Sequence, residues 1–440
     1  MDTEKKNNKL TIKTLKTFWE AEEALLIEPT DTGRFIETKN TIERVYVNKF
    51  ENHKQERLIL LQAAKDSTEA KNEYISRFGV SGVKKFTSSS GLHVYRLVAE
   101  TFPGHINNLY YIPQNGISIL LDAATDTTTS HRDINRASVI LQSIFNEPFS
   151  LKRIGAIILT HGHIDHFGGL HWFIRENNAD IYVHELDFKT IAQFEERVVL
   201  VSKDLSVFLK RAGVPQDKLH EMEEMYRFSK SLFKDLEPKH ALKEYEEIFG
   251  LKVIHTPGHC PGEVCLKYDD ILFTGDHILP TITPHQSPER IAPFCGLSHY
   301  LTSLNKVASL DDINLGLGGH EHEIVDIKKR THDLIAHHMK RLFRILKEIK
   351  TPLSTYMLTS VLYPSFGGYN HLLAITETGA HVEYLHDHGY LKIYNLESLL
   401  REDNPLLTFC LTKKGKEVLK KGKFNENLSD FDNITRKLGK

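Results

Sequence analysis

A ten-residue stretch, residues 160–169, concentrates side chains that can hold a metal ion. Its sequence, THGHIDHFGG, places three imidazoles and one carboxylate within six positions, at His161, His163, Asp165 and His166. Neutral imidazole and carboxylate groups are ligands of zinc and similar divalent ions. Alternate ligands on a tight loop can serve one ion while the next pair serves a second. The spacing therefore predicts a metal site.

The elements that must position this stretch are strands that end beside it. The apolar run 156–159 directly precedes the ligands and predicts a buried strand. Three later segments each add one more candidate ligand: HTPGHCPG gives His259 after a strand-like run, LFTGDH gives Asp276 at another strand end, and LGGHEH gives His320 after two glycines. In α/β folds the loops at strand ends gather on one edge of the sheet, so distant segments can converge there.

These four motifs, in this order, resemble those of the metallo-β-lactamase superfamily over residues 92–325. The resemblance implies an α/β fold, a four-layer αβ/βα sandwich with a two-metal site between its sheets. By analogy, the first metal has three imidazole ligands and the second has mixed ligands, with one bridging carboxylate. The first set is His161, His163 and His259; the second is Asp165, His166 and His320; Asp276 bridges both.

The same resemblance implies hydrolysis by a hydroxide that bridges two divalent metal ions, taken as Zn²⁺ with Fe or Mn as alternatives. Two metals can lower the pKa of a shared water from about 16 to near 7. His163 stands where a redox di-iron branch would carry Glu, which favours the hydrolytic members. Asp165 and His166 together resemble the glyoxalase II, lactonase and nuclease branches. Asp165 is also the candidate catalytic residue, because it could orient the hydroxide or relay its proton.

Some neighbouring side chains compete with this ligand set or have simpler roles. His322, two residues beyond His320, is the alternative ligand, and the Gly-Gly-His order favours His320. His255 and His277 adjoin ligand turns and are expected to pack, with support of the ligands as the alternative. Cys260 is expected to be a small packed residue rather than a ligand. The imidazoles of the C-terminal region are expected to have surface or capping roles: His381, His386 and His388.

Composition sets broad limits on partners and compartment. The 440 residues carry 56 Lys and Arg against 58 Asp and Glu, so no overall field marks a nucleic-acid or membrane partner. Local charge is uneven, since residues 413–440 hold nine Lys and Arg against four Asp and Glu. Four scattered cysteines do not make a disulfide framework, and neither a signal peptide nor a long apolar run occurs. We therefore expect a soluble protein of a reducing cytoplasm.

The chain divides into three expected regions. Residues 1–90 form an N-terminal extension of unknown role, with helices at 18–27 and 52–78 and a strand at 44–50. Residues 91–325 form the catalytic domain, and 187–248 is an almost wholly helical insertion in it, broken near 213–215. Residues 326–440 form a C-terminal helical domain with a basic tail, whose helix, helix, hairpin outline resembles a winged-helix module.

Within the catalytic domain, strands are expected in two groups separated by the insertion. The first group is a meander at 93–99, 108–112 and 117–122, followed after a polar break at 124–132 by a helix at 134–146, strands at 154–159 and 181–183 and a helix at 167–177. The second group covers 252–255, 263–267 and 271–274. Beyond it, helices are expected at 326–350, 354–362 and 370–389, and a hairpin at 391–394 and 407–411.

Two function classes follow from the resemblance. The first is hydrolysis of an ester, thioester or lactone of a small molecule, as in glyoxalase II, although the chain lacks a match to the cationic glutathione-binding segment of that enzyme. The alternative is an endoribonuclease or single-stranded nucleic-acid nuclease, which the C-terminal outline and the basic tail favour. A small-molecule substrate is the preferred partner, nucleic acid is a possible but less favoured one, and the sequence leaves the oligomeric state open.

Overall fold

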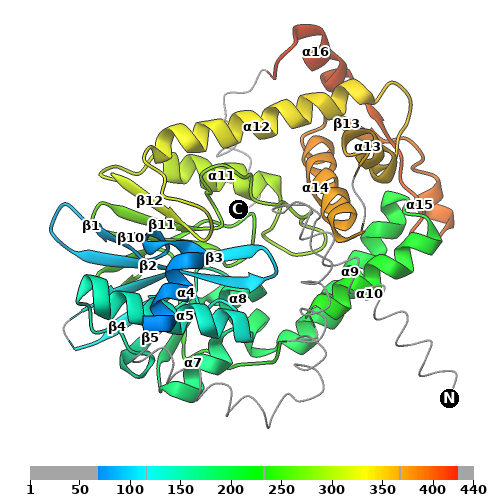
Figure 1. Ribbon diagram of the computed structural model, residues 1–440. Helices are drawn as coiled ribbons and strands as arrows, with labels where there is room; N and C mark the ends of the chain where they lie inside the picture. The colour runs from blue at the N-terminus through cyan, green and yellow to red at the C-terminus, as the bar shows by residue number, and fades with distance from the viewer. Residues whose placement is uncertain (1–67, 115, 231–232, 366–367, 425–440) are drawn as a thin grey trace, which may run out of the picture.

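A computed structural model describes residues 68–114, 116–230, 233–365 and 368–424 (Figure 1). Within them, one mixed sheet runs in the order β1-β2-β3-β4-β5-β6-β7, antiparallel as far as β4 and parallel beyond it. The antiparallel part confirms the expected meander. The strands are β1 (Lys84–Thr87), β2 (His93–Phe102), β3 (His105–Pro113), β4 (Ser118–Leu121), β5 (Ile154–Ile158), β6 (Asp180–His184) and β7 (His240–Leu242).

A second sheet runs in the order β12-β11-β10-β9-β8 and contains the later group of expected strands. Its members are antiparallel except for the parallel pair β11–β12. The strands are β8 (Glu247–Ile248), β9 (Leu251–His255), β10 (Val264–Tyr268), β11 (Ile271–Gly275) and β12 (Leu315–Gly318). The three expected strands of this group are confirmed as β9, β10 and β11.

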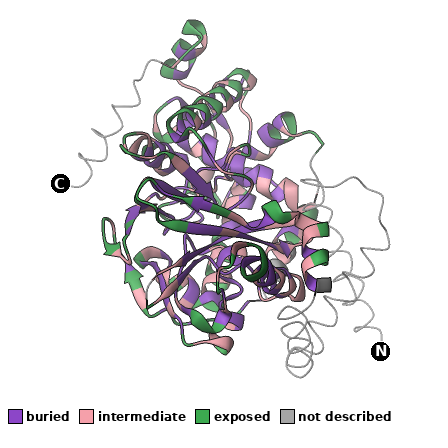
Figure 2. Cartoon of the chain, turned by 60° about the vertical axis from the view of Figure 1, so that its left-hand side comes forward, coloured by how far each residue is buried: buried purple, intermediate pink, exposed green. Residues whose placement is uncertain are grey.

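The two sheets pack face to face through a continuous apolar core. Ile112 and Ile158 of the first sheet belong to one buried cluster with Val253 and Phe273 of the second. Neighbouring residues in a strand point to opposite faces, so Ile157 instead meets the helices outside the first sheet. In Figure 2 the strands of both sheets are mostly purple, because each sheet is covered on both faces.

Helices cover the outer face of each sheet and complete a four-layer αβ/βα sandwich, as the resemblance implied. On the first sheet lie α4 (Thr68–Phe78), α5 (Thr128–Phe145) and α7 (Leu170–Glu176), with the short helices η1 (Val80–Gly82), η2 (Leu151–Arg153) and α6 (Ile164–Phe167). On the second sheet lie α11 (Leu297–Ala308) and α12 (Ile327–Glu348), which confirms the helix expected at 326–350. Of the expected N-terminal elements, only the end of the 52–78 helix lies within the described residues, as α4.

Two helix boundaries in the first half of the sandwich differ from expectation. The polar break expected at 124–132 ends earlier, since α5 begins at Thr128, where the Thr127 hydroxyl accepts a hydrogen bond from the Ser130 backbone amide. The helix expected at 167–177 is divided into α6 and α7, and α6 begins within the ligand stretch at Ile164. α5 starts before its first apolar residues because the Thr127 side chain caps it there. α6 has only four residues, which are too few to show a helical pattern of apolar residues.

The insertion between the two sheets is helical in its first part and extended in its last. It contains α8 (Glu185–Ala192), α9 (Phe194–Ala212) and α10 (Gln216–Lys230), with the break at Gly213 as expected. The expectation of helix up to residue 248 is wrong, because β7 pairs with β6 and β8 pairs with β9 at the sheet edges. Such short edge strands are stabilised by backbone pairing and carry too few side chains to show a period of two.

The C-terminal region follows α12 in the expected order of helix, helix and hairpin. Its elements are α13 (Thr355–Leu362), α14 (Gly368–Asp387), β13 (Leu391–Ile393), α15 (Ser398–Arg401), β14 (Phe409–Leu411) and α16 (Lys413–Lys421). β13 and β14 pair antiparallel. The identity of this region as a winged-helix module stays a prediction. It lies beside the insertion (Figure 1), where Leu372 and Ile375 of α14 share a buried cluster with Leu219 and Met222 of α10.

No helix in the described ranges combines the length and the apolar character that a bilayer crossing needs.

Candidate metal centre

The candidate ligands lie on the segments that follow four strands, and two of them, Asp165 and His166, are in the short helix α6. His161, His163, Asp165 and His166 follow β5, and the other three ligands follow β9, β11 and β12. β5 and β11 are buried along nearly their whole length, so their ends are fixed by packing on both faces. The structure therefore brings all seven predicted ligands together in two groups. Within each group, the donor atoms all lie within 4.8 Å of one another. Their role as ligands stays a prediction.

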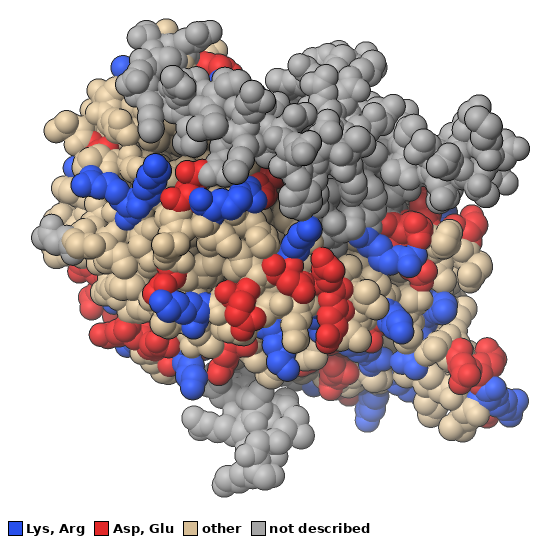
Figure 3. Space-filling view, turned by 90° about the horizontal axis from the view of Figure 1, so that it is seen from below, with Lys and Arg blue, Asp and Glu red and all other residues tan. Residues whose placement is uncertain are grey.

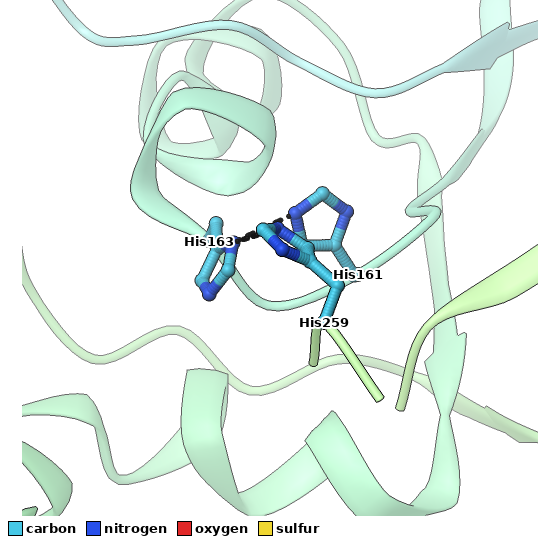
Figure 4. A group of neighbouring side chains, drawn as sticks. All are labelled: His161, His163 and His259. Carbon is cyan, nitrogen blue, oxygen red and sulfur yellow. Dashed lines mark hydrogen bonds between the residues drawn. The ribbon is translucent and has the colours of Figure 1, made fainter. Parts of the chain in front are cut away.

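The first group consists of three imidazoles that face a common point (Figure 4). The Nδ1 atom of His163 lies 3.0 Å from Nε2 of His161 and 3.0 Å from Nε2 of His259. His161 is fully buried, and its burial together with the neighbouring His166 and His163 imidazoles lowers its pKa well below the usual value. A neutral imidazole offers a lone pair, so these three nitrogens form a ligand set suited to zinc.

The second group consists of two imidazoles and two carboxylates. Nε2 of His320 lies 3.2 Å from Asp276 and 3.5 Å from Asp165, and Nε2 of His166 lies 3.5 Å from Asp276 and 3.4 Å from Asp165. Asp276 also reaches the first group, with Oδ2 3.9 Å from Nε2 of His259. Asp276 is thus placed between the groups, as a bridging ligand would be.

Each of four ligand imidazoles has its second ring nitrogen held by a partner outside the centre. Nδ1 of His166 lies 2.9 Å from the Asp122 carboxylate, and Nδ1 of His161 lies 3.0 Å from the Thr160 hydroxyl. Nδ1 of His259 donates to the His285 carbonyl, and Nδ1 of His320 donates to the Ile106 carbonyl, each at 2.8 Å. Such partners fix the tautomer and the ring orientation and leave Nε2 free for a metal.

Two supporting carboxylates were missed by the sequence analysis. Asp122 accepts hydrogen bonds from the backbone amide and the hydroxyl of Thr160 in addition to its contact with His166. Glu263 is fully buried and accepts from the backbone amides of Asp276 and His277. Burial and the nearby Asp276 raise the pKa of Glu263 well above its usual value. Both residues stand at a strand end, a signal that could have identified them.

Asp187 of α8, also missed, joins two ligand loops. Its fully buried carboxylate accepts from the backbone amide of Gly162 at 2.7 Å and from that of Gly262 at 3.0 Å, and the Cys260 thiol donates to it at 3.2 Å. Gly162 lies between two ligands, and Gly262 lies three residues after His259. A lone Asp in a helix gives no spacing signal, so only the folded chain reveals this link.

The first residues of β3 add two polar side chains beside the centre. Nε2 of His105 and Nδ2 of Asn107 each lie 3.1 Å from Oδ2 of Asp165. The His105 ring also lies 4.6 Å from that of His320 and keeps 28% of its side chain exposed. His105 is therefore the solvent-side neighbour of the candidate catalytic carboxylate. Neither residue belongs to a motif in the sequence.

The charge balance of the second group favours a bound cation. Burial alone lowers the pKa of His320, but Asp276 and Asp165 reverse this and raise that pKa to about 10. Burial also disfavours charge on His166, yet Asp165, Asp276 and Asp122 hold its pKa well above the usual value. The buried carboxylates thus attract positive charge into this site, and divalent ions would supply it.

The donor set fits metal ions on steric grounds as well. Oδ1 of Asp276 is buried and has no hydrogen-bond partner among the described residues, so one carboxylate oxygen is left for a ligand. Gly319 precedes His320, and a Cβ atom there would lie 2.7 Å from Cε1 of His166 and would also collide with Oδ1 of Asp276. The glycine is needed because the backbone approaches the ligands this closely. The seven residues can therefore hold divalent metal ions.

The competing histidines of the site take the places expected of packing residues. His322 is exposed and lies outside both donor groups, which favours His320. His255 bonds the Pro261 carbonyl and stacks on His184, and His277 packs edge-on against Tyr300.

One expectation about the C-terminal histidines is wrong. His381 is fully buried rather than at the surface: its Nδ1 bonds the Glu377 carbonyl and its Nε2 lies 3.0 Å from Nδ1 of His338. Arg341 pairs with Glu377 in the same cluster. α14 has apolar and polar residues on every side, so its sequence does not show which of its histidines faces the core.

Comparisons with known proteins agree with this geometry. Residues 103–320 match the family model of the metallo-beta-lactamase superfamily. A protein of Methanocaldococcus jannaschii named a probable metallo-hydrolase is 26% identical over 175 residues, which cover 40% of this chain and 68% of that protein. Another protein so named, from Bacillus subtilis, is 25% identical over 190 residues, covering 40% of this chain and 61% of the relative.

Solved structures share the fold. A metallo-beta-lactamase family protein from Thermus thermophilus superposes with a TM-score of 0.56 at 23% identity, covering 72% of this chain and 98% of that one. A beta-lactamase domain protein from Burkholderia ambifaria gives 0.59 at 19% identity, with 75% and 94% covered. The domain at residues 103–320 therefore belongs to the metallo-β-lactamase superfamily, and the chain is a metal-dependent hydrolase of that superfamily.

Proposed function

We propose that this protein is a dinuclear hydrolase that cleaves an ester, thioester or lactone of a small molecule. The observation that carries the proposal is the pair of donor groups joined by Asp276, which lies within 3.9 Å of His259 on one side and 3.2 Å of His320 on the other. One carboxylate between two complete ligand sets is the arrangement expected of a two-metal site.

The chain's own residues would orient the reaction. Two divalent ions, when bound, would supply a hydroxide nucleophile at neutral pH and polarise the oxygen of the substrate. Asp165 is held by hydrogen bonds from His105 and Asn107 at 3.1 Å, so its carboxylate is fixed beside the ligands. Although burial alone would raise the pKa of Asp165, the imidazoles of His166, His105 and His320 hold that pKa well below its usual value. Asp165 would therefore stay ionised and orient the attacking group through its free lone pairs.

The surroundings of the centre favour a small, uncharged reacting group. The segments that carry the candidate ligands, 160–166, 255–263, 275–285 and 318–323, and the adjoining segment 102–108 contain no Lys or Arg that could neutralise a phosphodiester chain. His161, His166, Asp276 and His320 are buried, so a substrate reaches the centre mainly past His163, Asp165 and His259. Figure 3 shows positive and negative side chains interspersed on the face drawn, without a field of one sign. An ester or thioester carbonyl meets these conditions.

Zinc is the proposed metal, with iron or manganese as alternatives. Three imidazoles in the first group and a mixed second group suit Zn²⁺, although the same donors also bind Fe and Mn. The cysteines add no ligand to either group and are free thiols, which supports the proposal of a reducing, cytoplasmic setting: Cys260, Cys265, Cys295 and Cys410.

A nuclease is the second candidate, and α16 is the observation in its favour. This helix and the residues just after it carry six lysines beside a single acidic residue, Glu417. Surface lysines can bind phosphates without reading a sequence. The lysines are Lys413, Lys414, Lys416, Lys420, Lys421 and Lys423.

Hydrolysis assays on four substrates distinguish these candidates. S-D-lactoylglutathione, an acyl-coenzyme A, a γ-lactone and a labelled single-stranded RNA are each incubated with wild type, Asp165→Asn and the matched control His322→Gln, with and without chelator. The proposal expects turnover of an ester, thioester or lactone that chelator and Asp165→Asn abolish and His322→Gln retains. RNA cleavage that depends on Asp165, without turnover of the other three, would reverse the ranking.

A further inference from the structure

One candidate ligand, His259, takes its ring orientation from a segment without regular structure. Its Nδ1 atom donates to the His285 carbonyl at 2.8 Å. The corresponding partner of His320 is the Ile106 carbonyl, which strand pairing fixes within β3, whereas residues 276–296 between β11 and α11 form neither a helix nor a strand. The position of the His285 carbonyl therefore depends on contacts with other parts of the chain.

Helix α14 of the C-terminal region supplies such contacts. The Glu377 carboxylate accepts a hydrogen bond from the backbone amide of Gln286 at 2.7 Å. The His285 ring is attached to the same helix, since its Nε2 atom lies 3.1 Å from the Leu373 carbonyl and 3.0 Å from the Thr376 hydroxyl. Gln286 is fully buried and Glu377 is nearly so, which strengthens a hydrogen bond between them. Two adjoining residues of the irregular segment are thus attached to one helix.

The Gln286 amide and the His285 carbonyl are the two ends of one peptide group. A trans peptide group is planar, and its N–H and C=O bonds point in opposite directions. A hydrogen bond at the amide therefore fixes the direction of the carbonyl. A carboxylate at the amide also polarises the peptide group, which strengthens the bond that the carbonyl accepts from His259. Carboxylate, peptide group and imidazole thus form one hydrogen-bonded chain that ends at a candidate metal ligand.

Arg341 of α12 holds the Glu377 carboxylate in place. It forms an ion pair with Oε1 of Glu377, whereas Oε2 accepts from the Gln286 amide. α12 and α14 are in contact and lie near each other in Figure 1. A buried carboxylate needs such a partner, because an unpaired buried charge is strongly destabilising. Both oxygens of Glu377 are therefore committed, one to the ion pair and one to the peptide group.

Glu383, six residues further along α14, makes a similar pair of contacts. It accepts from the backbone amide of Glu289 at 2.7 Å and from the Arg290 side chain at 2.9 Å. Both carboxylates therefore hold the segment 285–290. Only Glu377 bonds the peptide group whose carbonyl faces the metal centre.

We propose that Glu377 is a positioning residue of the metal centre, which acts on His259 through the peptide group between His285 and Gln286. The proposal rests on the proposed metal centre. It goes beyond that centre, because Glu377 belongs to the C-terminal region, outside the family-model match at residues 103–320. Loss of the Glu377 charge should weaken metal binding at the three-imidazole group, as loss of a partner behind a metal ligand does.

Stepwise binding of Co²⁺ to the full-length protein, freed of metal by chelator, tests the proposal. Competition with a chromogenic chelator gives the affinity of each step, and the visible absorption of bound Co²⁺ reports its ligand geometry. Glu377→Gln removes the charge and keeps the size of the side chain, and Glu383→Gln is the matched control on the same helix. His259→Ala identifies the step that belongs to the three-imidazole group.

A second variant tests the segment without breaking the buried ion pair of Arg341 and Glu377. His285→Ala retains the backbone carbonyl but removes the attachment of the ring to α14. The Tm of each variant in excess chelator measures the cost to the fold, so that a loss of stability is not mistaken for a loss of metal affinity.

Glu377→Gln should weaken the step identified by His259→Ala by about tenfold or more and change its Co²⁺ spectrum. His285→Ala should weaken the same step, and Glu383→Gln should bind as wild type does. The proposal is overturned if Glu377→Gln binds as wild type does, or if Glu383→Gln causes an equal loss. It is also overturned if both steps weaken equally along with the Tm in chelator, as a purely structural role would require. Two unchanged steps in His259→Ala would contradict the metal centre itself, and this proposal with it.

Discussion

At the scale of single residues, the geometry of the centre depends on the hydrogen-bond partners of the candidate ligands as much as on the ligands themselves. His166 and His320 face the same carboxylates, but each is fixed from behind by a different partner, Asp122 and the Ile106 carbonyl. These partners come from other segments of the chain, so the ring orientations depend on the complete fold. The ligand that tolerates the least change is Asp276, because both donor groups converge on it.

The first prediction concerns Asp187, whose carboxylate ties together two ligand loops. Asp187→Asn keeps the size of the side chain but replaces one acceptor oxygen by a donor, which faces the Gly162 or the Gly262 amide. Metal affinity should fall about 10- to 100-fold, as for other residues that support ligands. Competition with a chromogenic chelator measures it. Glu185→Gln, exposed on the same helix, is the control and should bind as wild type does; equal affinities in both variants would contradict the assigned role.

The second prediction concerns Gly319, whose backbone approaches the centre too closely for a side chain. The Cβ of Gly319→Ala would lie 2.7 Å from Cε1 of His166 and against Asp276, so the Asp276 carboxylate must move. Metal content should fall for the second site, while the Tm measured in excess chelator should change little. Elemental analysis of the purified variant checks this. A metal content equal to that of wild type would contradict this prediction, because it would show that the backbone at residue 319 can shift to make room for the added Cβ.

The site residues that the sequence predicted and those it missed differ in how far along the chain each lies from the residues it contacts. The seven ligands stand in four short motifs at strand ends, and the order of these motifs placed them near one another. Asp187 and His105 act on partners 25 and 60 positions away. No local pattern marks such contacts, because they form only when the loops are folded together.

At the scale of elements, the strand ends carry most of the positioning. β5, β9 and β11 were visible in the sequence as short apolar runs, so three of the four strand ends that precede the candidate ligands were predictable. β12 was not predicted as a strand, although the two glycines marked His320. β7 was not, because it is three residues long and is held by backbone pairing with β6. Helix α11 was also not predicted, although its apolar residues cover the second sheet.

The third prediction concerns His184, which ends β6 and begins α8. Burial and the stacked His255 ring lower the pKa of His184 to about 3. The folded protein therefore binds fewer protons than the unfolded chain below about pH 6.5, so stability is lost as the pH falls from that value. His184→Asn retains an acceptor at the N-cap position of α8, before the first helical residue Glu185, but cannot titrate.

Urea unfolding of chelator-treated protein at about pH 7.5 and about pH 5 measures this effect. The loss of unfolding free energy between the two pH values should be smaller in His184→Asn than in wild type by about 2 kcal/mol, which is one and a half pH units of one proton. An equal loss in both proteins would show that His184 is not held neutral by its surroundings.

At the scale of the whole molecule, the metal centre lies at the edge of the sandwich, and the insertion and the C-terminal region pack against each other outside it. Leu219 of α10 and Ile375 of α14 share a buried cluster, and α14 also holds the segment 285–290 near the centre. The insertion carries none of the ligand motifs, and the C-terminal region lies beyond the family-model match. These two additions are therefore linked by packing, and α14 in turn contacts a segment beside the centre.

The fourth prediction is that metal removal destabilises the whole sandwich. Ions that bind only the folded state add about 4 kcal/mol at a thousandfold excess over Kd. For a domain of this size, this corresponds to about 8 °C or more in Tm. Calorimetric scans with and without chelator measure the shift. The double variant His163→Ala/His320→Ala should show no such shift, and a chelator effect of the same size in that variant would place the stabilising ions elsewhere.

Metal content is the most direct test of the central claim, that seven side chains form two adjoining metal sites. Elemental analysis should find about two equivalents in wild type and in His322→Ala, and about one in His259→Ala and in His320→Ala, because each of these two variants removes a ligand of one group. Less than about half an equivalent in wild type, or the same content in all four proteins, would contradict the account.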